Sequence, residues 1–237
     1  MALPKLNSAP KYEMTIPSSG KLVRYRPFLV KEEKSLMIAS ESGNPKDVFK
    51  GLVDTIGACV EGEINTNKLT SFDVEYMFLQ MRAKSVGETS KVGLRCSECE
   101  HSNEIGIRLD DIKIEASGGL KTLTLTDEIQ VEIGYPTFYD IINSGIDAEK
   151  EPTTDQAFGL IRSCLKSIIT QDERIDLADV STKEIQEFLD SMSAGQFQQI
   201  KEFVDGIPKL THDVEFECTK CKHQNKITIE GIANFLS

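Results

Sequence analysis

The sequence predicts an α+β fold on three observations. Residues 12–30 form two short extended segments joined by a Pro-Ser-Ser-Gly turn, which indicates an N-terminal β-hairpin. Later segments show the apolar spacing and the terminal residues of helices. The phrase CSECEHSNEI at Cys96 returns as CTKCKHQNKI at Cys218, each time between segments that alternate like strands. We therefore expect an N-terminal hairpin and helices, a zinc-ribbon-like β module built from two distant Cys-x-x-Cys knuckles, and an inserted β/helical region.

Three helices are expected before the first knuckle. The first follows the hairpin directly. The second begins at Asn44, a good N-cap, with Pro45 at the first helical position, and its apolar face includes Cys59 as a core thiol. The third begins at Thr70 or Ser71 and carries acidic residues in its first turn and basic residues in its last, as the helix dipole favours.

The segment between the knuckles predicts strands followed by helices. The stretch TLTLTDEIQVEIGYP alternates between apolar and polar residues, which indicates at least one strand pair. Helices are expected over residues 155–170, 183–192 and 195–204, and Cys164 falls on an apolar stripe as a second core thiol. Their expected N-caps are Ser181 or Thr182, and Ser193.

This order predicts three regions in the chain. Residues 1–90 form a hairpin plus helical region, and residues 91–112 and 210–237 together form a split zinc-ribbon-like module. Residues 113–209 form the inserted strand and helical region between the halves of that module.

Composition narrows the class of protein. The 237 residues are 39% apolar and 27% charged, which is typical of a globular protein, and no apolar run is long enough to cross a bilayer. The N-terminal residues show no secretory signal, so we expect a reducing compartment in which paired cysteines serve metal or redox chemistry. The net charge of −11 disfavours nucleic acid as a partner.

The two copies of the repeated phrase agree residue by residue. The apolar alternation continues after each knuckle, so each copy reads as strand, knuckle, strand. The matched pairs are Cys96 with Cys218, Cys99 with Cys221, His101 with His223, Asn103 with Asn225, and Ile105 with Ile227.

Two such knuckles supply the four soft ligands of a structural zinc ion. The predicted ligands are Cys96, Cys99, Cys218 and Cys221. Residues 100–217 separate the two pairs, far more than in a local zinc ribbon, so the ion would act as a clasp between distant segments. Four thiolates suit iron as well as zinc.

Other interpretations of the knuckles stay open. The pairs could be metal-free, disulfide-bonded or redox-active, although a redox pair is expected at a helix start and strands follow both knuckles here. His101 and His223 are expected not to be ligands but to donate hydrogen bonds near the sulfurs or to cover them.

The sequence does not indicate an enzyme. It has no nucleophile-elbow, phosphate-loop or zinc-protease motif, and a site closed by four thiolates leaves no position for a substrate. The alternative to a structural role is a nucleic-acid-binding or regulatory zinc ribbon, which would need a basic face. The two knuckles carry opposite charges instead, which argues against a basic face. The first has Glu98 and Glu100 at the positions where the second has Lys220 and Lys222.

Four stretches carry a further signal and together span almost the whole chain: PSSGKLVRYRPFLVKEEKSLMIA, LTSFDVEYMFLQMRAKSVGE, LRCSECEHSNEI and FECTKCKHQNKITIEGIANFL. In these stretches the sequence resembles the baseplate hub (assembly) proteins of T-even-like contractile-tailed bacteriophages. In one departure from common zinc ribbons, Glu100 and Lys222 follow the second cysteine of each knuckle, where a left-handed backbone often places glycine.

The resemblance implies a structural protein of the viral tail. It would belong to a multi-subunit complex, contact other baseplate hub and tail proteins, and be located in the virion tail baseplate, with the host cytoplasm as its place during assembly. The surfaces expected to make these contacts are the N-terminal arm, the first hairpin and the Phe235-Leu236 tail.

Overall fold

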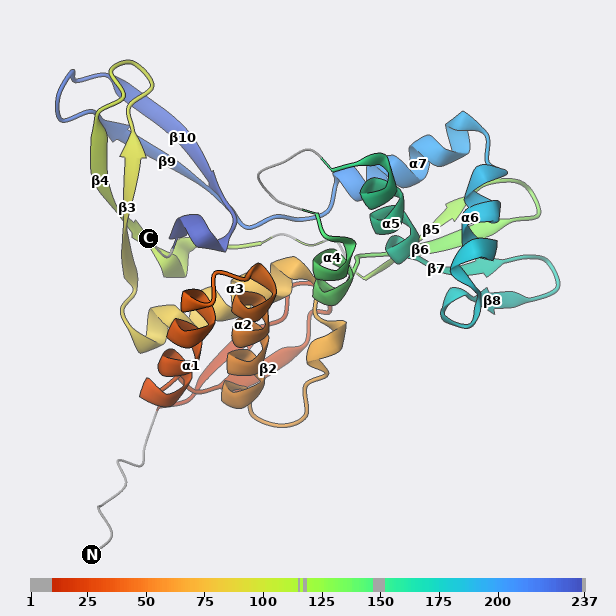
Figure 1. Cartoon of the computed structure of the whole chain (residues 1–237), viewed down its shortest axis with the longest axis horizontal. Helices are drawn as coiled ribbons and strands as arrows, with labels where there is room; N and C mark the ends of the chain where they lie inside the picture. Colours follow the sequence, from red (N-terminus) through yellow and green to blue (C-terminus); the bar gives the residue numbers. More distant parts are fainter. Residues whose placement is uncertain (1–9, 115, 117–118, 147–151, 236–237) are drawn as a thin grey trace, which may run out of the picture. The chain divides into compact units, whose positions relative to one another are not determined.

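The computed structural model describes residues 10–114, 116, 119–146 and 152–235 (Figure 1). The chain divides into two compact units. The first unit is formed within Met1–Thr66, Phe72–Glu115 and Lys209–Ser237, and the second within Asn67–Ser71 and Ala116–Pro208. The α+β class expected from the sequence is confirmed, since helices and small antiparallel sheets alternate along the chain. The N-terminal arm, residues 1–9, and Leu236 lie outside the described residues.

The first unit begins with the expected hairpin and three helices. In the hairpin, Tyr12 pairs with Tyr25 and Thr15 with Leu22. The Asn44 side chain accepts a hydrogen bond from the Lys46 N–H, which confirms the predicted N-cap. The elements are β1 (Tyr12–Thr15), β2 (Leu22–Tyr25), α1 (Val30–Glu41), α2 (Pro45–Cys59) and α3 (Ser71–Ser85). The short η1 (Thr66–Lys68) lies at the boundary, with its last two residues in the second unit.

Helix α3 forms the centre of this unit. Apolar side chains from nearly every turn of α3 are buried, and the hairpin turn is tied to it because Asp73 accepts a hydrogen bond from the Ser18 N–H at 2.8 Å. Burial removes this apolar surface from water at about 25 cal/mol per Å². The buried residues of α3 are Phe72, Asp73, Val74, Met77, Phe78, Leu79, Met81 and Ala83.

A buried ion pair joins the hairpin to α1. The Arg26 guanidinium lies 2.8 Å from the carboxylate of Glu32, which is only 6% exposed. Burial alone would raise the pKa of Glu32, but the hydrogen bonds from Arg26 and from the Leu29 N–H outweigh it and lower the pKa to about 2. The charge is therefore held at all physiological pH values.

The rest of the first unit consists of two matching hairpins and two short turns. In the C-terminal turn the side chains of Ile232 and Phe235 are buried, and Phe235 is fully inaccessible to solvent. The expectation that Phe235 belongs to an exposed docking tail is wrong, because its ring fills the core of this unit. The elements are β3 (Thr89–Arg95), β4 (Ser102–Arg108), η2 (Leu109–Asp111), β9 (Thr211–Glu217), β10 (Gln224–Glu230) and η4 (Ile232–Phe235).

The second unit is a four-stranded antiparallel sheet with helices. The sheet has the order β5-β6-β7-β8. The core of the unit includes Val131 and Ile133 from the sheet and Ile200 from a helix. The Ser181 and Ser193 caps are confirmed. The elements are β5 (Leu120–Thr124), β6 (Gln130–Gly134), α4 (Phe138–Ser144), α5 (Thr154–Cys164), β7 (Leu165–Ile169), β8 (Arg174–Asp176), η3 (Leu177–Asp179), α6 (Thr182–Asp190) and α7 (Ala194–Asp205).

One predicted helix is too long. The helix expected over residues 155–170 ends at Cys164, and the next five residues form β7. Pairing with β6 makes this segment a strand. The Ser167 hydroxyl donates a hydrogen bond to Glu132 of β6 at 2.5 Å, and the same carboxylate forms an ion pair with Arg174 of β8. Helix α4 and strand β8 were not expected from the sequence.

Among the described residues, no helix is long and apolar enough to cross a membrane.

Candidate metal centre

The two knuckles are presented by hairpins with the same register. In the β3–β4 hairpin Leu94 pairs with Asn103, and in the β9–β10 hairpin Phe216 pairs with Asn225. Inward side chains alternate with exposed ones along all four strands. The repeated phrase therefore folds into the same local structure twice, as the sequence predicts.

Each knuckle is closed by the same pair of backbone hydrogen bonds. The Cys96 N–H donates to the His101 carbonyl at 2.9 Å, and the Cys218 N–H donates to the His223 carbonyl at 2.8 Å. The residue after the second cysteine returns a hydrogen bond to the first and has a positive φ, 57° at Glu100 and 64° at Lys222. These are the left-handed positions at which zinc ribbons often have glycine.

This backbone geometry predicts a stabilising substitution. Lys222→Gly is expected to raise the free energy of unfolding by about 1 kcal/mol, because the left-handed conformation costs a residue with a Cβ roughly 1–2 kcal/mol and glycine far less. Its ion pair with Glu217 is exposed and contributes little. Chemical denaturation measures the change. The matched control is Lys220→Gly in the same turn, whose φ is not positive; it should be neutral or destabilising, and equal effects at both positions would contradict the explanation.

The four cysteine sulfurs converge at the meeting point of the two hairpins. All four Sγ atoms lie within 4.8 Å of one another. Cys96 Sγ is 3.6 Å from Cys221 Sγ, and Cys99 Sγ is 3.7 Å from Cys218 Sγ. A zinc ion with four Zn–S bonds of about 2.3 Å requires sulfur separations of about 3.8 Å, so these distances fit a tetrahedral site. The thiols are free rather than disulfide-bonded.

The backbone around the first cysteine of each knuckle favours the thiolate. N–H groups of Cys221 and Lys220 lower the pKa of Cys218 to about 6. At Cys96, burial raises the pKa, but the N–H groups of Cys99 and Glu98 outweigh it and the pKa lies below its ordinary value. The thiolate is the form that binds a metal ion.

The side chains beside the sulfurs are two asparagines. Asn103 and Asn225 are buried, and each places its amide nitrogen near the first cysteine of the opposite knuckle, 3.7 Å from Cys218 Sγ and 3.5 Å from Cys96 Sγ. The sequence contains their signal, since both occupy the same place in the repeat, but the sequence interpretation gave them no role.

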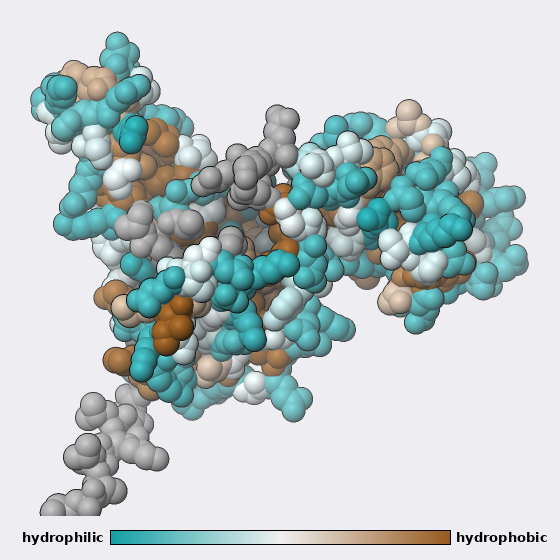
Figure 2. All heavy atoms as spheres, in the orientation of Figure 1, coloured by the Kyte–Doolittle hydropathy of each residue, from teal (hydrophilic) through white to brown (hydrophobic). Residues whose placement is uncertain are grey.

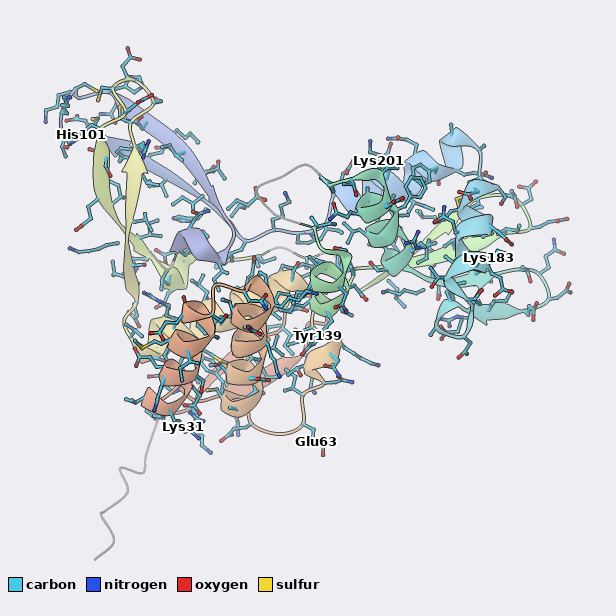
Figure 3. The ribbon with its side chains drawn as sticks, in the orientation of Figure 1. Lys31, Glu63, His101, Tyr139, Lys183 and Lys201 are labelled. Atoms are coloured by element: carbon cyan, nitrogen blue, oxygen red, sulfur yellow. The ribbon has the colours of Figure 1, made fainter. Side chains whose placement is uncertain are left out.

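The two histidines of the repeat lie further out. His101 and His223 are exposed, and both accept the Cys N–H hydrogen bonds through their backbone carbonyls. Figure 3 shows His101 at the outer end of the β3–β4 hairpin. Their side-chain role beside the sulfurs stays a prediction.

The remaining two thiols are core residues, as expected. Cys59 and Cys164 are 1% and 0% exposed. Burial raises the pKa of Cys59 and raises that of Cys164 to about 12, so both remain neutral thiols. Among the described residues, the thiols that could hold a metal ion are therefore those of the knuckles, where four thiolates would leave an ion no open coordination position.

Among the described residues, the α+β fold brings four thiols together between two hairpins, which is the ligand set of a structural metal site. The chain belongs to the family described as T4 bacteriophage base plate protein, whose family model matches residues 9–237. A relative is the baseplate hub assembly protein gp26 of Enterobacteria phage T4, which is 23% identical over 225 residues covering 95% of this chain and 97% of the relative. No solved structure matches the chain.

Proposed function

We propose that this protein is a non-enzymatic assembly component of a phage tail baseplate hub, which acts through contacts with other hub and tail proteins. The observation that supports this most is the family match over residues 9–237, together with a relative whose name is that of a hub assembly protein. The proposed place of action is the tail baseplate of the virion, reached from the host cytoplasm during assembly.

The proposal includes a structural zinc clasp held by Cys96, Cys99, Cys218 and Cys221. Its support is the sulfur geometry and the thiolate-favouring backbone around Cys96 and Cys218. The clasp would close a split zinc-ribbon-like module, residues 91–112 and 210–237, around the inserted region 113–209. Such a clasp stiffens the first unit and performs no chemistry on a substrate.

Charges on the clasp hairpins favour a protein partner over nucleic acid. In each hairpin a lysine forms an ion pair with a glutamate of the neighbouring strand, so acidic side chains partly offset the basic ones. The sequence predicts that Lys222 lies near a glutamate of the facing knuckle. Its ammonium instead lies 3.4 Å from the carboxylate of Glu217, in its own hairpin. The other pairs are Lys91 with Glu104 and Lys226 with Glu215.

The surface proposed for hub contacts is the outer face of α1. Val30, Met37 and Ile38 are 78%, 59% and 57% exposed, which is unusual for apolar side chains on one helix. The α1–α2 groove beside them has a volume of about 460 Å³, with Ile38, Ala39 and Gly51 in its lining together with charged residues of both helices. These charged residues are Lys31, Glu32, Asp47, Lys50 and Asp54. Figure 2 shows hydrophobic residues at the surface over this part of the first unit. An apolar helix face next to a groove suits a helix of another hub subunit.

Charging this face is expected to abolish assembly without unfolding the protein. The double variant Val30→Glu, Met37→Glu should keep its stability within about 0.5 kcal/mol, because both side chains are exposed. It should fail to restore plaque formation to a phage whose own copy of the gene is inactive, because unpaired carboxylates in an apolar contact cost about 2 kcal/mol or more.

Two single variants make this experiment specific. Val86→Glu, at a valine outside α1 that is 61% exposed, should restore plaque formation fully. Leu22→Glu tests the first hairpin as the contact surface in the same assay. Normal plaques with the charged α1 face would contradict the docking surface, and normal plaques without the gene would contradict the assembly role itself.

A further inference from the structure

Two asparagines occupy the interior of the proposed clasp. Asn103 and Asn225 are 2% and 4% exposed, and they stand at the same position of the repeat and the same position of the strand ladder. A buried amide is costly unless its oxygen and nitrogen both find partners. Where those partners lie therefore shows what the two residues hold together.

The oxygen of each amide binds the opposite knuckle. Asn225 Oδ1 accepts hydrogen bonds from the backbone N–H of Ser97 at 2.9 Å and from its hydroxyl at 3.0 Å. Asn103 Oδ1 accepts the matching pair from Thr219, both at 2.9 Å. Ser97 and Thr219 each follow the first cysteine of their knuckle, so both asparagines reach across to the turn that carries a ligand.

The nitrogen of each amide points toward a sulfur. Asn103 Nδ2 donates to the carbonyl of His101 in its own hairpin at 2.9 Å and lies 3.7 Å from Cys218 Sγ. Asn225 Nδ2 donates to the carbonyl of His223 at 3.0 Å and lies 3.5 Å from Cys96 Sγ. An N–H donor stabilises a thiolate, and four thiolates around a divalent ion leave excess negative charge for such donors to offset.

We propose that Asn103 and Asn225 are positioning residues of the clasp, a reciprocal pair in which each side chain fastens the opposite knuckle and orients its first cysteine toward the metal. This inference rests on the proposed metal site. In each asparagine the two amide atoms have different roles. The oxygen joins the two distant knuckles, and the nitrogen stabilises the thiolate. Neither role is available to an apolar residue, and an aspartate could fill only the first.

That division of roles defines the test. Asn103→Asp and Asn225→Asp keep an oxygen for Thr219 or Ser97 but replace the N–H donor with a negative charge beside the sulfurs. Each is expected to lower zinc affinity by about 10–100-fold in competition with a chromophoric chelator, as removal of an outer-shell partner of a metal ligand commonly does. Cobalt(II) in place of zinc reports the ligand set, and its thiolate-to-metal absorption should shift in both variants.

Two further substitutions separate the oxygen's role from the nitrogen's. Ser97→Ala and Thr219→Val remove one of the two hydrogen bonds to each amide oxygen and leave the Nδ2 contacts in place. We expect a smaller loss of zinc affinity and a cobalt spectrum close to that of the parent. Asn103→Ala removes the contacts of both the oxygen and the nitrogen. If this alanine variant fails to fold, the test still stands, because the aspartate variants keep both oxygen contacts and the hydroxyl variants lose only one contact of each asparagine.

The parent protein distinguishes the two proposals. One zinc per parent chain, with zinc affinity and cobalt spectrum unchanged in both aspartate variants, would overturn the role of the asparagines and leave the clasp standing. No zinc in the parent chain would overturn the clasp, and the asparagine role with it. A loss in the aspartate variants that exceeds the loss in the hydroxyl variants is the result we expect.

Discussion

Replacing Cys99 and Cys221 with serine is expected to remove the metal and to lower the free energy of unfolding of the first unit by about 4–5 kcal/mol. The clasp ties together segments separated by residues 100–217, and cross-linking a loop of this length removes an unfolded-state entropy worth roughly 4.7 kcal/mol at 25 °C. Elemental analysis should find one zinc ion per parent chain and none in the double variant. Denaturant unfolding before and after chelation of the parent should show a loss of similar size.

The two core thiols provide the matched control. Cys59→Ala and Cys164→Ala also remove cysteines but lie away from the knuckles, so both variants should keep one zinc ion and their sensitivity to the chelator. A parent chain with four free knuckle thiols, no metal and no response to chelation would contradict the clasp and return attention to the redox alternative.

The stability of the first unit is also expected to fall as pH rises through neutrality, because of Glu75 in α3. Burial, aided by the charge of Glu230, raises the pKa of Glu75 to about 7, although an N–H hydrogen bond from Ile232 partly opposes this. The folded state therefore holds a proton that the unfolded state releases near pH 4.5. The contribution of this proton to the free energy of unfolding is complete below pH 4.5 and is lost as pH rises through 7, a change on the order of 3 kcal/mol.

Glu75→Gln should remove this dependence. Glutamine keeps an acceptor for the Ile232 N–H and cannot ionise, so the variant should be more stable than the parent at pH 8 and nearly equal to it at pH 4.5. Urea unfolding across this range gives the difference, in which all other titrating groups cancel. Glu32 acts in a separate window with the opposite sign, since its lowered pKa makes it stabilising above pH 4.5 and that stability is lost as pH falls toward 2. Parallel curves for parent and variant would show that Glu75 is ionised in the fold.

Elements whose signals lie within the element itself were predictable. The caps Asn44, Ser181 and Ser193 mark helix starts because they hydrogen-bond to the next turn of the chain, and the same holds for the hairpin turn. The knuckle strands were predictable because apolar and polar residues alternate in each copy of the repeat, which indicates a strand with one buried face. Identity of the four candidate ligands follows from spacing alone.

Elements that depend on contacts with distant segments were not predictable from the sequence. The run from Leu165 to Ile169 continues a helical pattern, yet it becomes β7 because β6 offers it a pairing edge. Strand β8 is held by Arg174 on Glu132 of β6. Helix α4 is a different case, because its capping box at Thr137 is a local signal that the sequence interpretation missed. Propensity is a weak prior, and tertiary pairing outweighs it in such short segments.

The sequence by itself determined the α+β class, the capped helices, the two knuckles and the thiols that could hold a metal, because these depend on residue type and short spacing. Only the tertiary structure decided that Asn103 and Asn225 reach across to the opposite knuckle, that Phe235 is buried, and that burial raises the pKa of Glu75 to about 7. Each of these depends on which groups meet from far apart in the chain, and burial and hydrogen-bond geometry exist only once those groups have met.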